Sequence, residues 1–502
     1  RQMCIRDRLQ SIQEDKRESV NVAMENLPAD NLKYYDLGSG LVTNTIGSSM
    51  IKWNMASFMG RINYNYLGRY LLTVSARYDG SSRLADGHKW VLFPSAALAW
   101  RINEESFMSS TSGWLDNLKL RLGFGKTGNS AVDPYQTKGT LSLIRYPFDN
   151  GGTPTIGYAP NAMANSLLTW ETTDQWNLGI DFGVLRGRIN GTIDLYMQNT
   201  HDLLLKRQLP VVSGFPDVLS NVGKTRNKGI EVSINSMNIN SKDFQWTTDL
   251  MLSSNKEEIV ELYNGKNDDI GSKWFIGQPV NVHYDYRKVG IWQNTESDLA
   301  EMAKFAANGT EFAPGDIKIQ DVNGDYKITD ADKQILGNPR PKLIASMVNT
   351  FNYKGFDLSV FLYASFGAML YNDIYAVEHC GRNGGVKVDY WTPNNPTNAY
   401  PRPSIDEERP IYITSTYYEK ADFLRVKTMT LGYTLPKTLT NKFLVEKLRV
   451  YFTAQNPFIF TNYTGIDPEA AKVNSAGNPE TNGSGFGTPS VSSWIFGINL
   501  TL

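Results

Sequence analysis

The last nine residues alternate strictly between large apolar side chains and side chains that are mostly small or polar. The apolar side chains occupy every second position, at Trp494, Phe496, Ile498, Leu500 and Leu502. Because successive side chains of a β-strand point to opposite faces, this period of two predicts a strand with one face in an apolar medium. A strand of this kind fits a soluble sheet as well as a membrane barrel. The choice between the two therefore depends on whether the pattern is repeated along the chain.

The same alternation recurs along most of the chain. It is clearest in segments 61–66, 70–79, 118–124, 176–182, 189–197, 230–235, 244–252, 356–362 and 448–453. We count thirteen or fourteen such strands. Their length of about ten residues is what a tilted strand needs to cross a bilayer. Segment 423–435 is less regular, because Arg425 and Lys427 share the parity of Leu431. We expect a β-bulge there that restores the phase.

The connections between these strands alternate in length. Short turns are predicted at Gly68-Arg69, Leu185-Gly187, Asn240-Asp243 and Lys354-Gly355. Long connections are predicted at 126–169, 262–341 and 367–421. Short turns at one rim and long loops at the other are typical of outer-membrane barrels, and charged residues on the polar face suit a wet or plugged lumen. The pattern therefore predicts an all-β fold, a transmembrane antiparallel up-and-down β-barrel.

The loop lengths favour the larger class of barrels, which has about 22 strands and a plugged lumen. We therefore interpret the chain as the C-terminal part of such a barrel, without its plug. Residues 57–502 are assigned to the barrel, with an external loop at 296–340, whereas residues 1–56 are an uncertain start, either truncated barrel or loop.

Composition narrows the possible functions. The formal net charge is −1, which excludes a strongly basic surface for nucleic acid. Aromatic residues make up 12% of the chain, and outward ones such as Trp494, Trp176 and Tyr70 are expected to form an interfacial girdle against outer-membrane lipid. The four histidines lack the HExxH spacing, and no pair of carboxylates has a spacing that demands acid–base chemistry. We therefore predict that the chain is not an enzyme.

The sharpest local motif is the twelve-residue segment 321–332, DVNGDYKITDAD. Its expected calcium ligands are Asp321, Asn323, Asp325, the Lys327 carbonyl, Thr329 and Asp332. A hard cation takes six to eight oxygens, and this spacing wraps them around one point as in EF-hand and dockerin-like loops. Tyr326 departs from the glycine that such loops prefer at the sharp turn, and a metal-free turn rich in Asp and Asn is the alternative. Calcium would be structural, by fastening a long external loop.

Two further features lie in the long connections. Residues Glu296–Ala307 are expected to form a short amphipathic helix capped by Thr295, with Leu299, Met302 and Phe305 on its apolar side. In the 367–421 loop, the candidates for contact with a ligand or a lid protein are Tyr390, Trp391, Tyr400 and Arg402. Aromatic planes there could stack on sugar rings, or they could simply hold their own loop in place.

Several strings in this chain resemble a known family. They include GRINYNY at 60–66, RYDGSSR at 77–83, FPS at 93–95, WETT at 170–173, DLLL at 202–205, NVGK at 221–224, NKGIE at 227–231, LRVK at 424–427, LGYTLP at 431–436 and GIDPE at 465–469. In these strings the chain resembles the SusC/RagA family of TonB-linked outer-membrane proteins of Bacteroidota. The signal peptide, plug and TonB-contacting segment of that family have no counterpart in this sequence.

The resemblance implies import of a bulky nutrient, a glycan or an oligopeptide, through the outer membrane. It also implies a SusD-like surface lipoprotein as lid, and energy delivered by TonB through the N-terminal part that this chain lacks. The alternative from another class is a secreted or surface-anchored calcium-binding all-β module that binds glycans without transport. The direction of the apolar faces separates the two, because a membrane barrel turns them outward and a soluble module encloses them.

Overall fold

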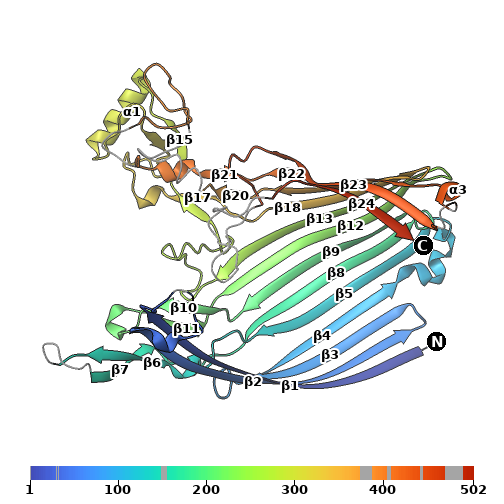
Figure 1. The fold of residues 1–502 in the computed structure, drawn as a ribbon, viewed down its shortest axis with the longest axis horizontal. Helices are drawn as coiled ribbons and strands as arrows, with labels where there is room; N and C mark the ends of the chain where they lie inside the picture. The colour runs from blue at the N-terminus through green and yellow to red at the C-terminus, as the bar shows by residue number, and fades with distance from the viewer. Residues whose placement is uncertain are drawn as a thin grey trace.

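The computed structural model describes residues 2–29, 31, 33–148, 155–372, 387–403, 409–440, 442, 445–469 and 490–501. Its main feature is one antiparallel sheet of 14 strands that curves like the wall of a barrel (Figure 1). The strands lie in the sheet in chain order: β1 (Gln2–Glu25), β2 (Val42–Tyr66), β3 (Tyr70–Ser81), β4 (Trp90–Arg101), β5 (Leu115–Asn129), β8 (Glu171–Val184), β9 (Ile189–His201), β12 (Lys224–Asn240), β13 (Phe244–Glu261), β18 (Leu343–Tyr353), β19 (Phe356–Phe366), β22 (Phe423–Thr434), β23 (Lys447–Thr461) and β24 (Ser493–Thr501). Among the described strands β1 pairs only with β2 and β24 only with β23, so the sheet is open.

Shorter elements fill the connections. Five two-stranded ribbons pair β6 (Thr140–Tyr146) with β7 (Thr155–Ala162), β10 (Leu204–Gln208) with β11 (Asp217–Asn221), β14 (His283–Asp285) with β17 (Gln334–Gly337), β15 (Lys288–Ile291) with β16 (Ile317–Ile319), and β20 (Met369–Tyr371) with β21 (Tyr418–Lys420). In the part of the chain that the structure describes, the α-helices are α1 (Glu296–Ala307) and α3 (Lys437–Thr440). Single 3-10 turns lie at Leu37–Ser39, Ile102–Glu104, Ser106–Thr111, Gln136–Lys138, Val211–Ser213, Asp330–Asp332 and Ile413–Thr416. None of the helices in the described ranges has the length and apolar character needed to span a membrane.

The predicted asymmetry between the two rims is confirmed. The connections between β2 and β3, β8 and β9, β12 and β13, and β18 and β19 are tight turns at one end of the strands, where both marked chain ends also lie (Figure 1). The ribbons and α1 project from the opposite end (Figure 1). We call these two ends the short-turn rim and the long-loop rim.

The register places apolar side chains in rows on one face of the sheet. One row runs across five neighbouring strands through Leu98, Leu122, Leu178, Leu195 and Ile230. These five side chains are 40–48% exposed, although they are large and apolar. The last strand continues this face, with Trp494 at 61% and Phe496 at 83% exposure. The apolar face therefore points outward, as in a membrane barrel, and the enclosed core required by the soluble alternative is not formed by these strands.

Aromatic side chains gather on this face near both rims. Toward the short-turn rim, Tyr66, Tyr70 and Trp100 stack with ring centroids about 6.4 Å apart. Toward the long-loop rim, Trp90 stacks on Tyr78 at 4.9 Å and on Phe58 at 6.2 Å. Eight residues separate Tyr70 from Tyr78 on β3, which at ~3.4 Å per residue and a tilt of ~40° gives a height of roughly 20 Å. That height fits an apolar band between two interfacial girdles.

The irregular strand behaves as predicted. In β22, the pairing with both β19 and β23 skips from Val426 to Thr428, so Lys427 is the bulged residue. The bulge lets Arg425 point to the polar face while Leu431, six positions later, points to the apolar face with 50% exposure. Without the extra residue, one of the two would face the wrong medium.

The start of the chain is strand rather than loop. Residues left uncertain by the sequence form β1 and most of β2, which are paired over almost their whole length. On β1, Arg6 lies beside Ile62 and Gln10 beside Phe58, so polar residues occupy the face that is apolar in β2. Because β1 lacks the alternating apolar face, periodicity gave no signal for it.

Candidate functional site

The face of the sheet opposite the apolar band carries charged side chains that pair between strands. Near its middle, the Arg121 guanidinium contacts Asp181 at 2.7 Å and Asp194 at 3.0 Å. Lys119 reaches Asp181 at 3.2 Å. Gly179 leaves room for this cluster, because a Cβ atom there would stand 2.5 Å from Arg121 Cζ. Charges of this density are costly against lipid but suit a wet surface, so this face is the candidate lining of a transport route.

The long-loop rim carries a folded body built from two connections. We call it the loop unit: residues 262–342, between β13 and β18, and the described part of 367–422, between β19 and β22. It rises above the sheet with α1 at its outer end (Figure 1). Its main buried core consists of Ile291, Ile317, Ile319, Trp391, Ile413 and Tyr417. Both connections contribute to this core, so they are packed as one unit.

The predicted helix is present in this unit. It spans Glu296–Ala307, and the Thr295 side chain accepts a hydrogen bond from the Asp298 backbone N–H. Met302 and Phe305 are buried against Trp292, whereas Leu299 is 45% exposed. The cap and two of the three expected apolar contacts are therefore confirmed, and Leu299 is the exception.

The structure gives different environments to the four candidates for contact in the 367–421 loop. Trp391 is only 6% exposed, and its indole N–H donates to Gln293 Oε1 at 2.8 Å. The Arg402 guanidinium pairs with Asp316 at 2.8 Å. These two residues hold the segment 387–403 against the rest of the loop unit, which agrees with the second of the two expected roles, that of holding their own loop in place.

The other two candidates remain nearer to solvent. Tyr390 is 46% exposed, and its backbone pairs with Tyr400 in an isolated parallel bridge. Tyr400 is partly buried against the main core of the loop unit. Tyr390 and Arg402 are both exposed, and of the three aromatic candidates only Tyr390 presents a ring that a partner or a ligand could cover.

The segment 321–332 folds back on itself through its acidic side chains. Asp321 accepts hydrogen bonds from the backbone N–H groups of Gly324 and Tyr326, both at 2.8 Å. Asp332 is fully buried and accepts from Val322 at 2.9 Å and Thr329 at 2.8 Å. The loop is thus closed by its first and last expected calcium ligands.

The middle of the same loop repeats this arrangement. Asn323 Oδ1 accepts from the Asp325 N–H at 3.1 Å, and Asp325 Oδ1 accepts from the Lys327 N–H at 2.8 Å. Within the described ranges, the carboxylates of Asp321, Asp325 and Asp332 have no Lys or Arg ion-pair partner. In the same ranges, no three acidic, histidine or cysteine side chains converge in a geometry ready for a metal. The donor set fits calcium in oxygen type and spacing, but the loop is closed here by its own N–H groups.

Tyr326 occupies the position where such loops prefer glycine. Its φ of +58° is left-handed, which is strained for a residue with a side chain. The ring packs edge-on against Phe305 with centroids 5.5 Å apart, and the Lys304 ammonium lies 5.2 Å from the ring centroid. Contacts with α1 therefore offset the strain of the turn, a compensation that the sequence alone did not indicate.

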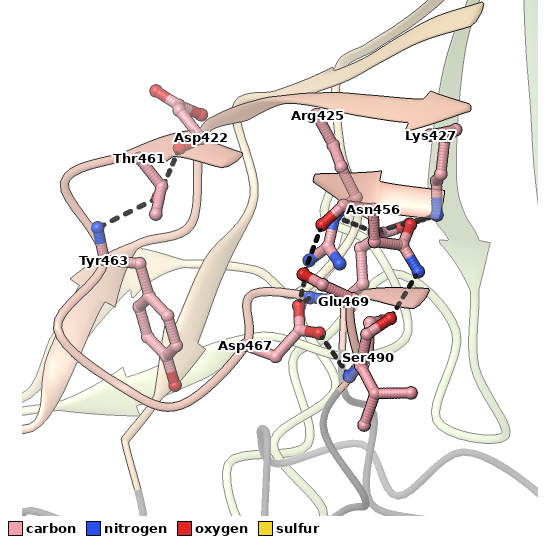
Figure 2. Close-up of polar contacts among 11 residues, drawn as sticks. Asp422, Arg425, Lys427, Asn456, Thr461, Tyr463, Asp467, Glu469 and Ser490 are labelled. Atoms are coloured by element: carbon pink, nitrogen blue, oxygen red, sulfur yellow. Dashed lines mark hydrogen bonds and ion pairs between the residues drawn. The ribbon is translucent and has the colours of Figure 1, made fainter. Parts of the chain in front are cut away.

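A buried ionic cluster lies at the long-loop end of β22. Figure 2 shows Arg425 and Lys427 facing the segment that follows β23. Arg425 contacts Asp467 at 2.5 Å and Glu469 at 2.7 Å, and Lys427 Nζ donates to Glu469 at 2.8 and 2.9 Å. The side chains of Arg425 and Asp467 are each only 4% exposed.

Asp467 also joins two segments that are distant in sequence. Its Oδ1 accepts from the Glu469 N–H and its Oδ2 from the Ser490 N–H, both at 2.9 Å (Figure 2). Burial raises the pKa of Asp467, but the Glu469 and Ser490 hydrogen bonds and the Arg425 charge outweigh it, so the pKa lies below its usual range. The carboxylate is held in the charged form and positions the connection from β23 to β24 at both ends.

Sequence reasoning missed this cluster, although its residues lie in the strings LRVK and GIDPE. The only signal was the wrong parity of Arg425 and Lys427, which predicted the bulge and not the partners. The contacts join residues 42 positions apart, a distance that no local pattern specifies.

Comparison with known proteins agrees with this geometry. The family model for the β-barrel of TonB-dependent receptor-like proteins matches residues 24–457. TonB-dependent receptor P3 of Formosa agariphila is 32% identical over 98% of this chain and 50% of its own length. TonB-dependent receptor SusC of Bacteroides thetaiotaomicron is 35% identical over 83% of this chain and 41% of its own length.

Solved structures show the same fold. The RagAB peptide importer in its open-open state matches all of this chain and 53% of its own, with a TM-score of 0.80 and 24% identity. The structure of the RagAB peptide transporter matches 99% of this chain and 56% of its own, with a TM-score of 0.77 and 22% identity. The chain spans about half the length of the curated relatives that it matches. These relatives are receptors and not enzymes, and the chain belongs to the β-barrel family of TonB-dependent receptors, whose members lie in the outer membrane.

Proposed function

We propose that the protein imports a bulky nutrient, a glycan or an oligopeptide, across the outer membrane with energy delivered by TonB. The observation that carries this proposal is the two-faced sheet, apolar and exposed outside and charged and ion-paired inside. The row from Leu98 to Ile230 supplies a surface for lipid, and the Arg121 cluster supplies a wet wall on the other side. A polar lining of this kind favours passage of hydrated cargo.

The peptide class has support from one relative, because the RagAB peptide importer is among the solved structures that share this fold. The glycan class comes from the resemblance to the SusC/RagA family. The resemblance to the SusC/RagA family adds a SusD-like surface lipoprotein as partner and TonB as the source of energy. The loop unit, at the rim opposite the short turns, is the part of this chain best placed to meet that lipoprotein (Figure 1).

A deletion strain tests the proposal. Cells that lack the full-length protein are grown on single glycans or single peptide mixtures, and uptake of the labelled nutrient is measured with and without TonB. We expect one nutrient class to lose uptake in the deletion strain, regain it on complementation and lose it again when TonB is removed. Equal uptake in all strains, for every nutrient, would contradict import by this protein.

We also propose that the segment 321–332 binds calcium in a structural role. Its support is the six oxygen donors at EF-hand spacing, together with three carboxylates that have no cationic partner among the described residues. Asp321 and Asp332 would hold the ion from the two ends of the loop, with Asn323, Asp325, the Lys327 carbonyl and Thr329 between them. Bound calcium would neutralise the carboxylates and stiffen the loop unit beside α1.

A further inference from the structure

A cavity of about 510 Å³ lies at the long-loop rim, away from the loop unit and the Arg425 cluster. Three segments supply most of its lining: the middle of β2 around Trp53, the connection between β3 and β4 around Arg83, and the connection between β5 and β6 around Tyr135; Ser166, between β7 and β8, completes it. Its volume is in the range of small-molecule sites. Trp53 shares the parity of Ser57 and Arg61 on β2, so it belongs to the face that we assign to the transport route.

Arg83 is fixed in this cavity without an anionic partner. Its guanidinium carbon lies 3.8 Å from the centre of the Trp53 ring, which holds the side chain flat against the indole. The Arg83 Nε atom is buried and has no hydrogen-bond acceptor among the described residues. A guanidinium presents five N–H donors in a planar fork, and Arg83 lines the cavity, so its terminal N–H groups offer donors to an oxyanion there.

The charge around Arg83 is strongly positive, although the chain as a whole is nearly neutral. The lining contains four cationic side chains, Lys52, Arg83, Lys89 and Lys138, and the single carboxylate of Asp86. Asp86 pairs with Lys89 at 2.5 Å but is 91% exposed, and Lys52 pairs outward with Glu14 at 3.0 Å. Arg83 and Lys138 have no ion-pair partner within the described ranges, so a net positive charge remains for a ligand.

The walls of the cavity are held rigidly. Leu84, next to Arg83, is 1% exposed in a core with Val132 and Leu168. Tyr135 has a left-handed φ of +73°, and its hydroxyl accepts a hydrogen bond from the Lys52 backbone N–H at 3.1 Å. A tyrosine in this conformation persists only where the surroundings over-determine it, a situation that is common at ligand sites. The three segments are thus joined before any ligand arrives.

We propose that this cavity binds an oxyanion carried by the imported nutrient, a carboxylate or a sulfate. Arg83 would receive it in a bidentate manner, with Lys138 and Lys89 completing the charge balance, and the exposed Tyr135 ring would contact the attached residue. The inference rests on the proposed import function and narrows its cargo to acidic molecules. Uronate-containing oligosaccharides and acidic peptides share this chemistry, and the test separates them.

The test measures binding by calorimetry to the full-length protein purified in detergent. The probes are a uronate trisaccharide, a triglutamate peptide and a neutral trisaccharide of equal size. We expect at least one acidic probe to bind and the neutral probe to bind at least about tenfold more weakly. Added salt should weaken binding of the acidic probe. Tighter binding of the uronate trisaccharide would identify the cargo as a saccharide, and tighter binding of triglutamate would identify it as a peptide. Equal binding of the two would show that the site recognises the oxyanion and not the rest of the molecule.

Variants locate the site. Arg83→Gln is expected to weaken binding of the acidic probe by about tenfold or more, because Arg83 supplies the only guanidinium among the described residues that line the cavity. Lys138 is exposed and has no ion-pair partner among the described residues, so Lys138→Gln is expected to keep the fold and to weaken binding of the acidic probe several-fold. Arg207→Gln, an exposed arginine on β10 at the same rim, serves as the matched control and leaves binding unchanged.

The outcomes separate this inference from the import function. Acidic probes that fail to bind, or that bind equally to the parent, Arg83→Gln and Lys138→Gln proteins, overturn the cavity assignment. Such a result leaves import standing if uptake of the nutrient still depends on the protein and on TonB. Conversely, oxyanion binding that requires Arg83, in a protein whose deletion changes no uptake, supports the cavity and overturns import.

Discussion

Arg425 of β22 and Asp467 of the connection after β23 form an ion pair of 2.5 Å in which each side chain is only 4% exposed. The same carboxylate accepts the backbone N–H groups of Glu469 and Ser490. One buried charge therefore fixes both ends of the last long connection to the barrel wall (Figure 2). The buried charges are stable because both oxygens of the carboxylate accept hydrogen bonds and Arg425 lies beside it.

Removal of this carboxylate should loosen the connection without unfolding the sheet. In Asp467→Ala, we expect the Glu469 and Ser490 amides to exchange hydrogen about a hundredfold faster, since breaking a buried ion pair costs about 3 kcal/mol or more. Hydrogen exchange read by mass spectrometry checks this. Glu18→Ala, which removes an exposed pair with Lys16, is the control and should change nothing measurable.

The pH dependence of this cluster follows from the direction of the shift. Because the folded pKa of Asp467 lies below its usual value, its stabilisation is complete above about pH 4, the unfolded pKa. It is lost only as pH falls through the lower, folded value. We expect protection of the Ser490 amide to persist at pH 4.5; loss of protection already at pH 6 would contradict the assignment.

Gly179 should tolerate no side chain beneath the Arg121 cluster. In Gly179→Ala, the new methyl group would meet Arg121 Cζ at 2.5 Å and Asp194 Oδ1 at 2.7 Å, so we expect a loss of about 1–3 kcal/mol in stability. Gly123→Ala, on the neighbouring strand with its nearest contact at 4.0 Å, is the matched control. Thermal unfolding in detergent compares the two, and equal melting temperatures would show that the polar cluster is not packed as described.

Calcium should protect the loop around 321–332 from proteolysis. We expect the parent protein to be cleaved more slowly between residues 310 and 340 when calcium is present, because the ion would order the loop. Asp321→Ala combined with Asp325→Ala should abolish the difference, whereas Asp330→Ala, which changes an exposed carboxylate outside the expected ligand set, should retain it. Equal cleavage of the parent with and without calcium would refute metal binding.

His283 should make the loop unit sensitive to acid. Burial lowers the pKa of this imidazole, an effect only partly opposed by its contact with the Met369 carbonyl at 2.8 Å. A folded pKa below the unfolded value of about 6.5 means that stability falls as pH decreases through 6.5 and below. We expect lower protection factors in β14 and β20 at pH 5 than at pH 7.5, measured as exchange rates relative to the intrinsic rate at each pH, and His283→Gln should flatten this dependence. The same dependence in His283→Gln as in the parent would assign it to another group.

Much of the sheet was predictable because its physics is local. Alternation marked the membrane-facing strands, the short turns fixed their order, and the parity break at Lys427 located the bulge. Strand β1 was missed because Arg6 and Gln10 interrupt its apolar face. The strand conformation of β1 is set by its pairing with β2 and not by an alternating sequence pattern, as happens when tertiary contacts override local preference.

The candidate site was less predictable, because its contacts join distant segments. Nothing near Trp391 in the sequence distinguishes a core residue from an exposed one, and its burial depends on strands about 75–100 residues earlier. The meeting of Arg83 with Trp53, and of Arg425 with Asp467, likewise depends on the closure of long loops. The motif at 321–332 could be recognised in the sequence because all of its oxygen donors lie within twelve consecutive residues.

The account depends most on which face of the sheet meets lipid. After Cys4 and Cys380 are replaced by serine, single cysteines are introduced in the full-length protein at the positions from Trp176 to Val184 of β8, except Gly179, where a side chain would meet Arg121, and are spin-labelled in liposomes. We predict that dissolved oxygen speeds the spin relaxation of labels at Trp176, Leu178 and Ile180, and that an aqueous nickel chelate speeds the relaxation of labels at Asn177 and Asp181. The same accessibility at even and odd positions, or the reverse alternation, would contradict the barrel.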